Sequence, residues 1–98
     1  MMAYDPGAID ATLAAAVGDE PGLIAELRLA FVESAERAYV LMAQAETADG
    51  WKAAAWRLKG LAASFGAIRL MALATDAVVA EPRDPATLAK LKRAIERL

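Results

Sequence analysis

The sequence predicts an all-α fold, and three observations support this. Alanine supplies much of the 58% hydrophobic fraction, and alanine is the best helix former because it loses no side-chain entropy in a helix. β-branched residues are few and scattered, which leaves little material for a sheet. Apolar residues recur three or four positions apart between breaks of Gly, Pro and Asp, as on one face of a helix. A chain of 98 residues predicts a single domain, residues 1–98, with one modest core.

A short first helix is expected to begin with Asp5 as the N-cap and Pro6 in the first helical position, an order that suits both residues. Ile9 and Leu13 mark its apolar face, and Gly18 follows it. Glycine readily adopts the left-handed conformation that closes helices, so the first helix should end there.

The second expected helix is long and runs from Asp19, its predicted cap, to about Thr47. Glu20 and Pro21 should fall in its first turn, where a carboxylate meets the positive end of the helix dipole. Phe31 lies on its apolar face and is therefore a core candidate. The full apolar set is Ile24, Leu27, Phe31, Ala35, Ala38, either Leu41 or Met42, and Ala45.

Three further helices are expected after the Asp49-Gly50 turn. The third is predicted over 51–65, with Asp49 as its cap, Trp51 packing beside that cap, and Gly66 at its end. The fourth is predicted over 68–80, and the fifth follows an Asp84-Pro85 start and reaches Leu98. Their apolar sets are Ala54, Leu58, Leu61 and Phe65, then Leu70, Leu73, Ala74, Ala77 and Val78, then Leu88, Leu91, Ile95 and Leu98. Short connections favour antiparallel neighbours, so we expect an up-down four-helix bundle with a short extra N-terminal helix.

Composition excludes several classes of function. The net charge of −2 shows no basic excess, so nucleic-acid binding is not expected. The chain has no cysteine, which removes disulfides and zinc–thiolate sites and fits a cytoplasmic protein. The most apolar segment, 70–80, carries Asp76 and is too short to span a bilayer, and residues 1–6 do not resemble a signal peptide.

The chain also has no histidine. This absence excludes imidazole acid–base chemistry, imidazole metal ligation and phosphohistidine formation within the chain. No nucleophile lies beside a base in the expected helices. We therefore expect a protein that is not an enzyme and that needs no cofactor or metal.

The most informative segment spans residues 55–67, with the sequence AWRLKGLAASFGA, and is followed by Leu70. It resembles the signature of histidine-containing phosphotransfer (HPt) domains. In that signature, a histidine precedes any residue and then Leu-Lys-Gly, with small residues and Gly-Ala at the helix end. The order and lengths of the helices, Ile9 and Leu13 in the first helix, and Phe31 in the second extend the resemblance over most of the chain.

The resemblance implies a bundle of HPt type in two-component phosphorelay signalling, with a response-regulator receiver domain or a histidine kinase as partner. Trp56 occupies the position of the phosphorylated histidine. Its indole nitrogen can only donate a hydrogen bond, because its lone pair belongs to the aromatic system. Lys59 is a cation, and Ser64 has no evident base beside it. Phosphotransfer by the family mechanism is therefore not expected.

The docking face implied by the resemblance is the outer face of the third helix. Helical geometry projects Lys52, Trp56, Lys59 and Ala63 away from the apolar stripe. Trp56 would be the hydrophobic centre and Lys59 the electrostatic contact, and Gly60, which costs about 1 kcal/mol against alanine in mid-helix, indicates a docking or packing reason. The candidate docking residues are Trp56, Lys59, Gly60, Lys52, Ala63 and Arg57.

Other interpretations of these residues stay open at this point. Trp56 could be tucked against the bundle, and Lys52, Arg57 and Lys59 could be ordinary solvated charges. The expected function is non-catalytic docking that titrates, blocks or scaffolds a signalling partner, with the monomer favoured. The alternative is a helix-bundle interaction or self-association module with no phosphorelay role.

Overall fold

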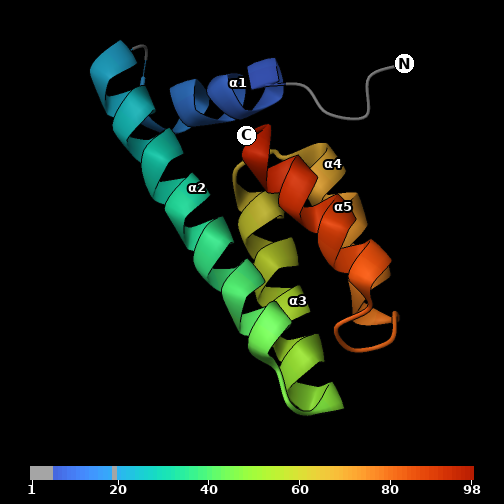
Figure 1. Cartoon of the computed structure of the whole chain (residues 1–98). Helices are drawn as coiled ribbons and strands as arrows, with labels where there is room; N and C mark the ends of the chain where they lie inside the picture. The colour runs from blue at the N-terminus through green and yellow to red at the C-terminus, as the bar shows by residue number, and fades with distance from the viewer. Residues whose placement is uncertain (1–5, 19) are drawn as a thin grey trace.

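The structure, a computed structural model, describes residues 6–18 and 20–98 and is built from α-helices (Figure 1). The all-α fold predicted from the sequence is confirmed. Within the described residues, no helix is both long enough and apolar enough to cross a membrane. The helices are α1 (Pro6–Val17), α2 (Pro21–Gln44), α3 (Ala48–Ser64), α4 (Ile68–Val78) and α5 (Pro85–Glu96).

Each helix packs on the next in the chain or on its spatial neighbour, so that one core is shared. α3 contacts both α2 and α4, α5 contacts both α4 and α2, and α1 packs on α2. In Figure 1, α2 is the longest rod and α1 crosses one end of the molecule, close to the C-terminus. Ile9 and Leu13, the predicted apolar positions of α1, are buried, so α1 covers that end of the core.

The core combines a few large side chains with many alanines. Phe31 is buried as predicted, and its ring stacks on that of Phe65, with centroids 4.6 Å apart and an interplanar angle of 16°. Such an aromatic pair contributes about 0.5–1.5 kcal/mol beyond its area burial. The largest fully buried side chains are Trp51, Phe31, Ile9, Met42, Leu58, Leu70 and Leu91.

The connection between α2 and α3 differs from the prediction. α2 ends at Gln44 rather than near Thr47, because Ala45 turns to an extended conformation with ψ 126°. Thr47 instead becomes the N-cap of α3, and its hydroxyl oxygen accepts a hydrogen bond from the Gly50 backbone N–H at 3.0 Å. Asp49 is consequently in the first turn of α3 and does not cap it. Threonine and aspartate both suit an N-cap, and the point at which α2 ends selects Thr47.

The start of α2 also differs. Glu20 is the N-cap residue, outside the first helical turn, and its side chain makes no capping hydrogen bond. Pro21 opens the helix, where its missing N–H is not needed. The predicted caps Asp5 and Asp19 lie outside the described residues.

Among the remaining helix ends, the glycine stops and the Asp84 cap follow the predicted signals, whereas α4 and α5 each end two residues earlier than predicted. Gly18 and Gly66 have φ angles of 81° and 71°, the left-handed conformation expected after a helix. Asp84 caps α5 by accepting a hydrogen bond from the Thr87 backbone N–H. α4 ends at Val78, not Ala80. The backbone N–H groups of Val79 and Ala80 bond to carbonyls three residues back, those of Asp76 and Ala77, which tightens the last turn and closes the helix. α5 ends at Glu96 rather than Leu98.

Candidate docking surface on α3

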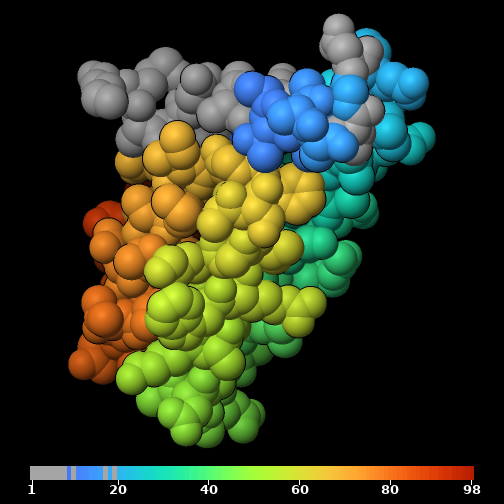
Figure 2. Space-filling view, turned by 180° about the vertical axis from the view of Figure 1, so that it is seen from behind, coloured from blue at the N-terminus to red at the C-terminus, as the bar shows by residue number. Residues whose placement is uncertain are grey.

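α3 has one face buried in the core and an opposite face that is open. Its buried residues are Trp51, Ala54, Ala55, Leu58 and Ala62. Two predicted members of the apolar stripe, Leu61 and Phe65, are only half-buried. Figure 2 shows α3, in yellow-green, running along the middle of one face of the molecule with no other helix over most of its length. The opposite side of α3 is therefore available to a partner.

Trp56 lies on this open side, and its side chain is 55% exposed. The Lys59 ammonium lies over its ring, 4.4 Å from the centroid. A cation in this position is attracted by the negative face of the ring, by about 0.5–1 kcal/mol at an exposed site. The pair thus places a positive charge against the face of an exposed apolar ring. The possibility that Trp56 is tucked into the bundle is excluded.

The structure brings together four of the six predicted docking residues in one stripe. Lys52, Trp56 and Ala63 are exposed, and Lys59 is half-buried. Their spacing of three or four residues places them on one helical face. Gly60 is exposed beside this stripe, whereas Arg57 points toward α2 and lines a groove there. We call these six residues, with Arg57 at the edge, the α3 face.

Gly60 has no packing role among the residues that the structure describes. A Cβ built at this position meets no atom within 4 Å outside its own helix backbone and chain neighbours. Its backbone is helical, so glycine is not required by conformation, and it is less stable there than alanine by about 0.5–1 kcal/mol. Close approach to another helix of this chain is therefore excluded as the reason for Gly60.

The α3 face is positively charged in a chain that is negative overall. From Gly50 to Thr75 the sequence contains four basic residues, Lys52, Arg57, Lys59 and Arg69, and no acidic one, against a net charge of −2 for the chain. Within residues 6–18 and 20–98, Lys52, Arg57 and Lys59 form no ion pair with an acidic side chain. Unpaired cations on one side of a small protein attract an anionic partner and steer its approach.

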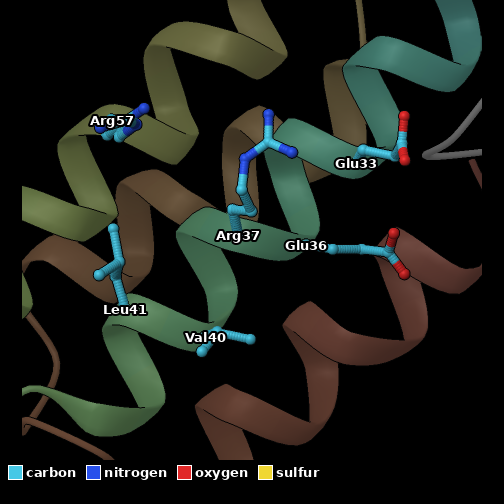
Figure 3. A pocket seen from close by; sticks show the side chains of 6 residues that line it. All are labelled: Glu33, Glu36, Arg37, Val40, Leu41 and Arg57. Atoms are coloured by element: carbon cyan, nitrogen blue, oxygen red, sulfur yellow. The ribbon is translucent and has the colours of Figure 1, made fainter.

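An open groove between α2 and α3 adjoins this face and was not predicted from the sequence. It has a volume of about 540 Å³ and is lined by Arg57 of α3 and by Glu33, Glu36, Arg37, Val40 and Leu41 of α2. Figure 3 shows Arg57 and Leu41 on one side of the groove and the two carboxylates on the other. The alternatives left open at Leu41 and Met42 are settled here, since Met42 is fully buried and Leu41 is 50% exposed.

Val40 and Leu41 are two large apolar side chains exposed next to each other on α2. Isolated exposed apolar residues are common on protein surfaces, but these two share a groove with two arginines, Arg37 and Arg57. The sequence did indicate that an apolar residue would be exposed here, because Leu41 and Met42 are neighbours on a helix and only one of them can point directly into the core. That signal did not say which of the two would be exposed.

Trp51 proves to be a central core residue rather than one that merely packs beside the cap. Its side chain is fully buried, and its indole N–H donates a hydrogen bond of 2.7 Å to the Ala77 carbonyl at the end of α4. The spacing of Trp51, Ala55, Leu58 and Ala62 could have indicated this face. Alanines on several sides of α3 widen the apolar stripe, however, and leave its centre ambiguous.

The α3 face offers hydrogen-bond donors and positive charge to a ligand or partner. The Trp56 indole N–H has no hydrogen-bond partner among the described residues and can donate one. Together with the cations it forms a set of donors that suits carboxylate or phosphate acceptors. Within the part of the chain that the structure describes, no cluster of three or more His, Cys, Asp or Glu side chains could hold a metal ion.

No protein-family model matches the chain, and comparisons with curated proteins and with solved structures find no significant similarity.

Proposed function

We propose that this chain is a non-catalytic docking domain of two-component signalling, with the helical bundle of an HPt domain but without its histidine. Its partner would be a response-regulator receiver domain or a histidine kinase. One observation carries the proposal. The residue that aligns with the phosphorylated histidine in the HPt-like segment 55–67 is Trp56, and its ring is exposed at the centre of an open, positively charged helix face.

Phosphotransfer by the family's histidine mechanism is not expected from the residues present. A phosphoryl acceptor needs a lone pair on a nucleophilic atom, and the indole nitrogen has none available. Lys59 places its Nζ over the ring, and the exposed Ser64 hydroxyl has no hydrogen-bonded base among the described residues that could activate it. The domain would therefore act by occupying a partner, so that it titrates, blocks or scaffolds that partner.

Gly60 supports docking through what it lacks. The helix tolerates a residue that destabilises it, although no atom of the described residues occupies the space where a Cβ would lie. Absence of a side chain lets a partner's backbone approach the helix closely. An external contact therefore accounts for a residue that internal packing does not.

Charge supports an acidic partner. A receiver domain presents a cluster of aspartates around its phosphorylation site, and the α3 face presents Lys52, Arg57 and Lys59 without ion-pair partners among the described residues. Complementary charges of this kind raise the association rate and are screened by salt. Aromatic and arginine side chains dominate binding energy at interfaces, which suits Trp56 and Arg57 as anchors.

Calorimetric titration with purified receiver domains tests the proposal. We expect at least one to bind, and the Trp56→Ala variant to bind that receiver about tenfold or more weakly, which corresponds to about 1.4 kcal/mol. Leu29 is the matched control, because it is 61% exposed on α2 and belongs neither to the α3 face nor to the residues that line the groove beside it. Leu29→Ala should bind as the parent does. Absence of binding to every receiver and kinase at high micromolar concentration would contradict the proposal.

Self-association is a second candidate function, favoured by the exposed side chains of Val40, Leu41 and Trp56. A two-fold contact through the α3 face would, however, bring the cations of one copy against those of the other. Like charges placed together in an interface disfavour it, so we rank this function second. Size-exclusion chromatography with light scattering separates the two, because a concentration-dependent dimer would support self-association.

A further inference from the structure

We infer that the outer face of α2 is a contact surface for a second copy of this chain, which packs on it in the antiparallel direction about a two-fold axis. The inference goes beyond the proposed function and does not depend on it, because it concerns a different helix. Its basis is a row of four side chains whose order along α2 is apolar, acidic, basic and apolar: Leu29, Glu33, Arg37 and Leu41. We call these four residues the α2 row.

The α2 row faces solvent. All four of its residues are exposed, and none belongs to the buried face of α2. Figure 3 shows three of them, Glu33, Arg37 and Leu41, following one another along the helix. Side chains four residues apart form a ridge on a helix, and ridges of this kind interdigitate in the commonest class of helix packing. The α2 row therefore has the arrangement that packs against another helix.

The two charges of the α2 row are not paired with each other. A glutamate four residues before an arginine can form an ion pair along one helix, but the Arg37 guanidinium instead donates a hydrogen bond of 3.0 Å to the Ser34 hydroxyl. Among residues 6–18 and 20–98, neither Glu33 nor Arg37 forms an ion pair. Both charges are therefore available to a partner.

The order of the residues in the α2 row selects the partner. A surface with only one sign of charge would attract one of the two charged side chains and repel the other. A parallel copy of α2 would place like charges opposite each other. An antiparallel copy centred between Glu33 and Arg37 places each charge against its opposite, and it places Leu29 against Leu41 at both ends. Contacts that are made twice in this reciprocal way are what a two-fold interface requires.

The apolar ends of the α2 row supply affinity, and its charges supply direction. Leu29 and Leu41 would bury exposed apolar surface at both ends of the contact, and Val40 is exposed beside Leu41. Ion pairs at a surface contribute little to affinity and are screened by salt, whereas like charges placed opposite each other disfavour the parallel orientation. We therefore expect a weak, antiparallel dimer whose affinity falls as salt is added.

Sedimentation equilibrium at low salt, up to millimolar concentration, tests the inference, and we expect the parent chain to form a dimer. Glu33→Arg and Arg37→Glu each give the α2 row two like charges, so each should weaken the dimer about tenfold or more. The double variant Glu33→Arg/Arg37→Glu reverses both charges and restores the reciprocal pairing, so its dissociation constant should lie within about threefold of that of the parent. No dimer of the parent, or no recovery in the double variant, would overturn the inference.

Two controls locate the contact, with the helical circular dichroism signal as the check that each variant folds. Glu81→Arg makes the same change in net charge as Glu33→Arg at an exposed position between α4 and α5, and it should leave the dimer intact. Trp56→Ala should do the same, because Trp56 belongs to the α3 face. Loss of the dimer in either control would overturn the inference. No receiver enters these measurements, so their failure would leave the proposed function standing.

Discussion

Replacing Trp51 with alanine should destabilise the protein far more than the same replacement of Trp56, although both residues lie on α3. Trp51 is fully buried and donates a hydrogen bond of 2.7 Å to the Ala77 carbonyl, and truncation of a buried tryptophan costs about 3–5 kcal/mol. Trp56 is 55% exposed. Its truncation removes a cation–π contact of about 0.5–1 kcal/mol, partly offset by a gain of a few tenths in helix propensity, and so should cost about 1 kcal/mol or less.

Urea unfolding followed by the helical circular dichroism signal measures both effects, and it avoids fluorescence, which each substitution would alter. A domain of this size has about 5–10 kcal/mol of stability, so Trp51→Ala should lose a large part of it. At about 4–8 °C per kcal/mol, the melting temperature should fall by about 12–40 °C for Trp51→Ala and by less than about 8 °C for Trp56→Ala. Equal losses for the two variants, or about 3 kcal/mol for Trp56→Ala, would refute the assignment of Trp51 to the core and Trp56 to the surface.

Three further outcomes are expected. Gly60→Ala should raise the free energy of unfolding by about 0.5–1 kcal/mol, because the added methyl group meets open space and alanine favours the helix, yet it should weaken receiver binding; a destabilised variant in urea would contradict this. Stability should fall as the pH drops below 3.8, the ordinary pKa of Asp84, because hydrogen bonds from the Thr87 backbone N–H and hydroxyl lower the pKa of this carboxyl in the folded state. Asp84 binds its proton more weakly in the folded state, so its contribution to the free energy of unfolding is complete above pH 3.8 and is lost as the pH falls through the lowered pKa. The Asp84→Ala variant should therefore have a urea midpoint that differs from that of the parent at neutral pH and converges with it in acid. Trp56→His restores a ring-nitrogen lone pair. A phosphorylated receiver that binds this variant should transfer its phosphoryl group to the new imidazole, which would carry an acid-labile label that the parent chain never acquires. A variant that binds these receivers and stays unlabelled would argue against a complementary face.

The helix boundaries show how far local signals reach. The Asp84-Pro85 start and the Gly66 end are determined by residues next to each other in the chain, and they could be predicted for that reason. The choice between Thr47 and Asp49 could not, because both side chains can cap a helix. It depends on where α2 ends, and this in turn depends on how α2 and α3 pack.

Part of the candidate docking surface could likewise be predicted from the sequence, and part could not. The spacing of Lys52, Trp56, Lys59 and Ala63 places them on one side of a helix whatever its neighbours are. Whether that side faces water depends on how α3 is rotated against α2 and α4. With alanine on several sides of α3, more than one rotation buries similar apolar area, so the pattern placed Trp56 on the outer face but did not show that Trp51 lies at the centre of the core.

Two properties of this protein follow from the sequence without any knowledge of the fold: a helix-rich chain, because alanine content and apolar spacing act locally, and the absence of imidazole chemistry, because the chain has no histidine. The exposure of the Trp56 ring, the ammonium over its face, and the groove beside Leu41 required the packed structure. Solvent access is a property of how helices pack, and contacts between residues far apart in the chain decide it.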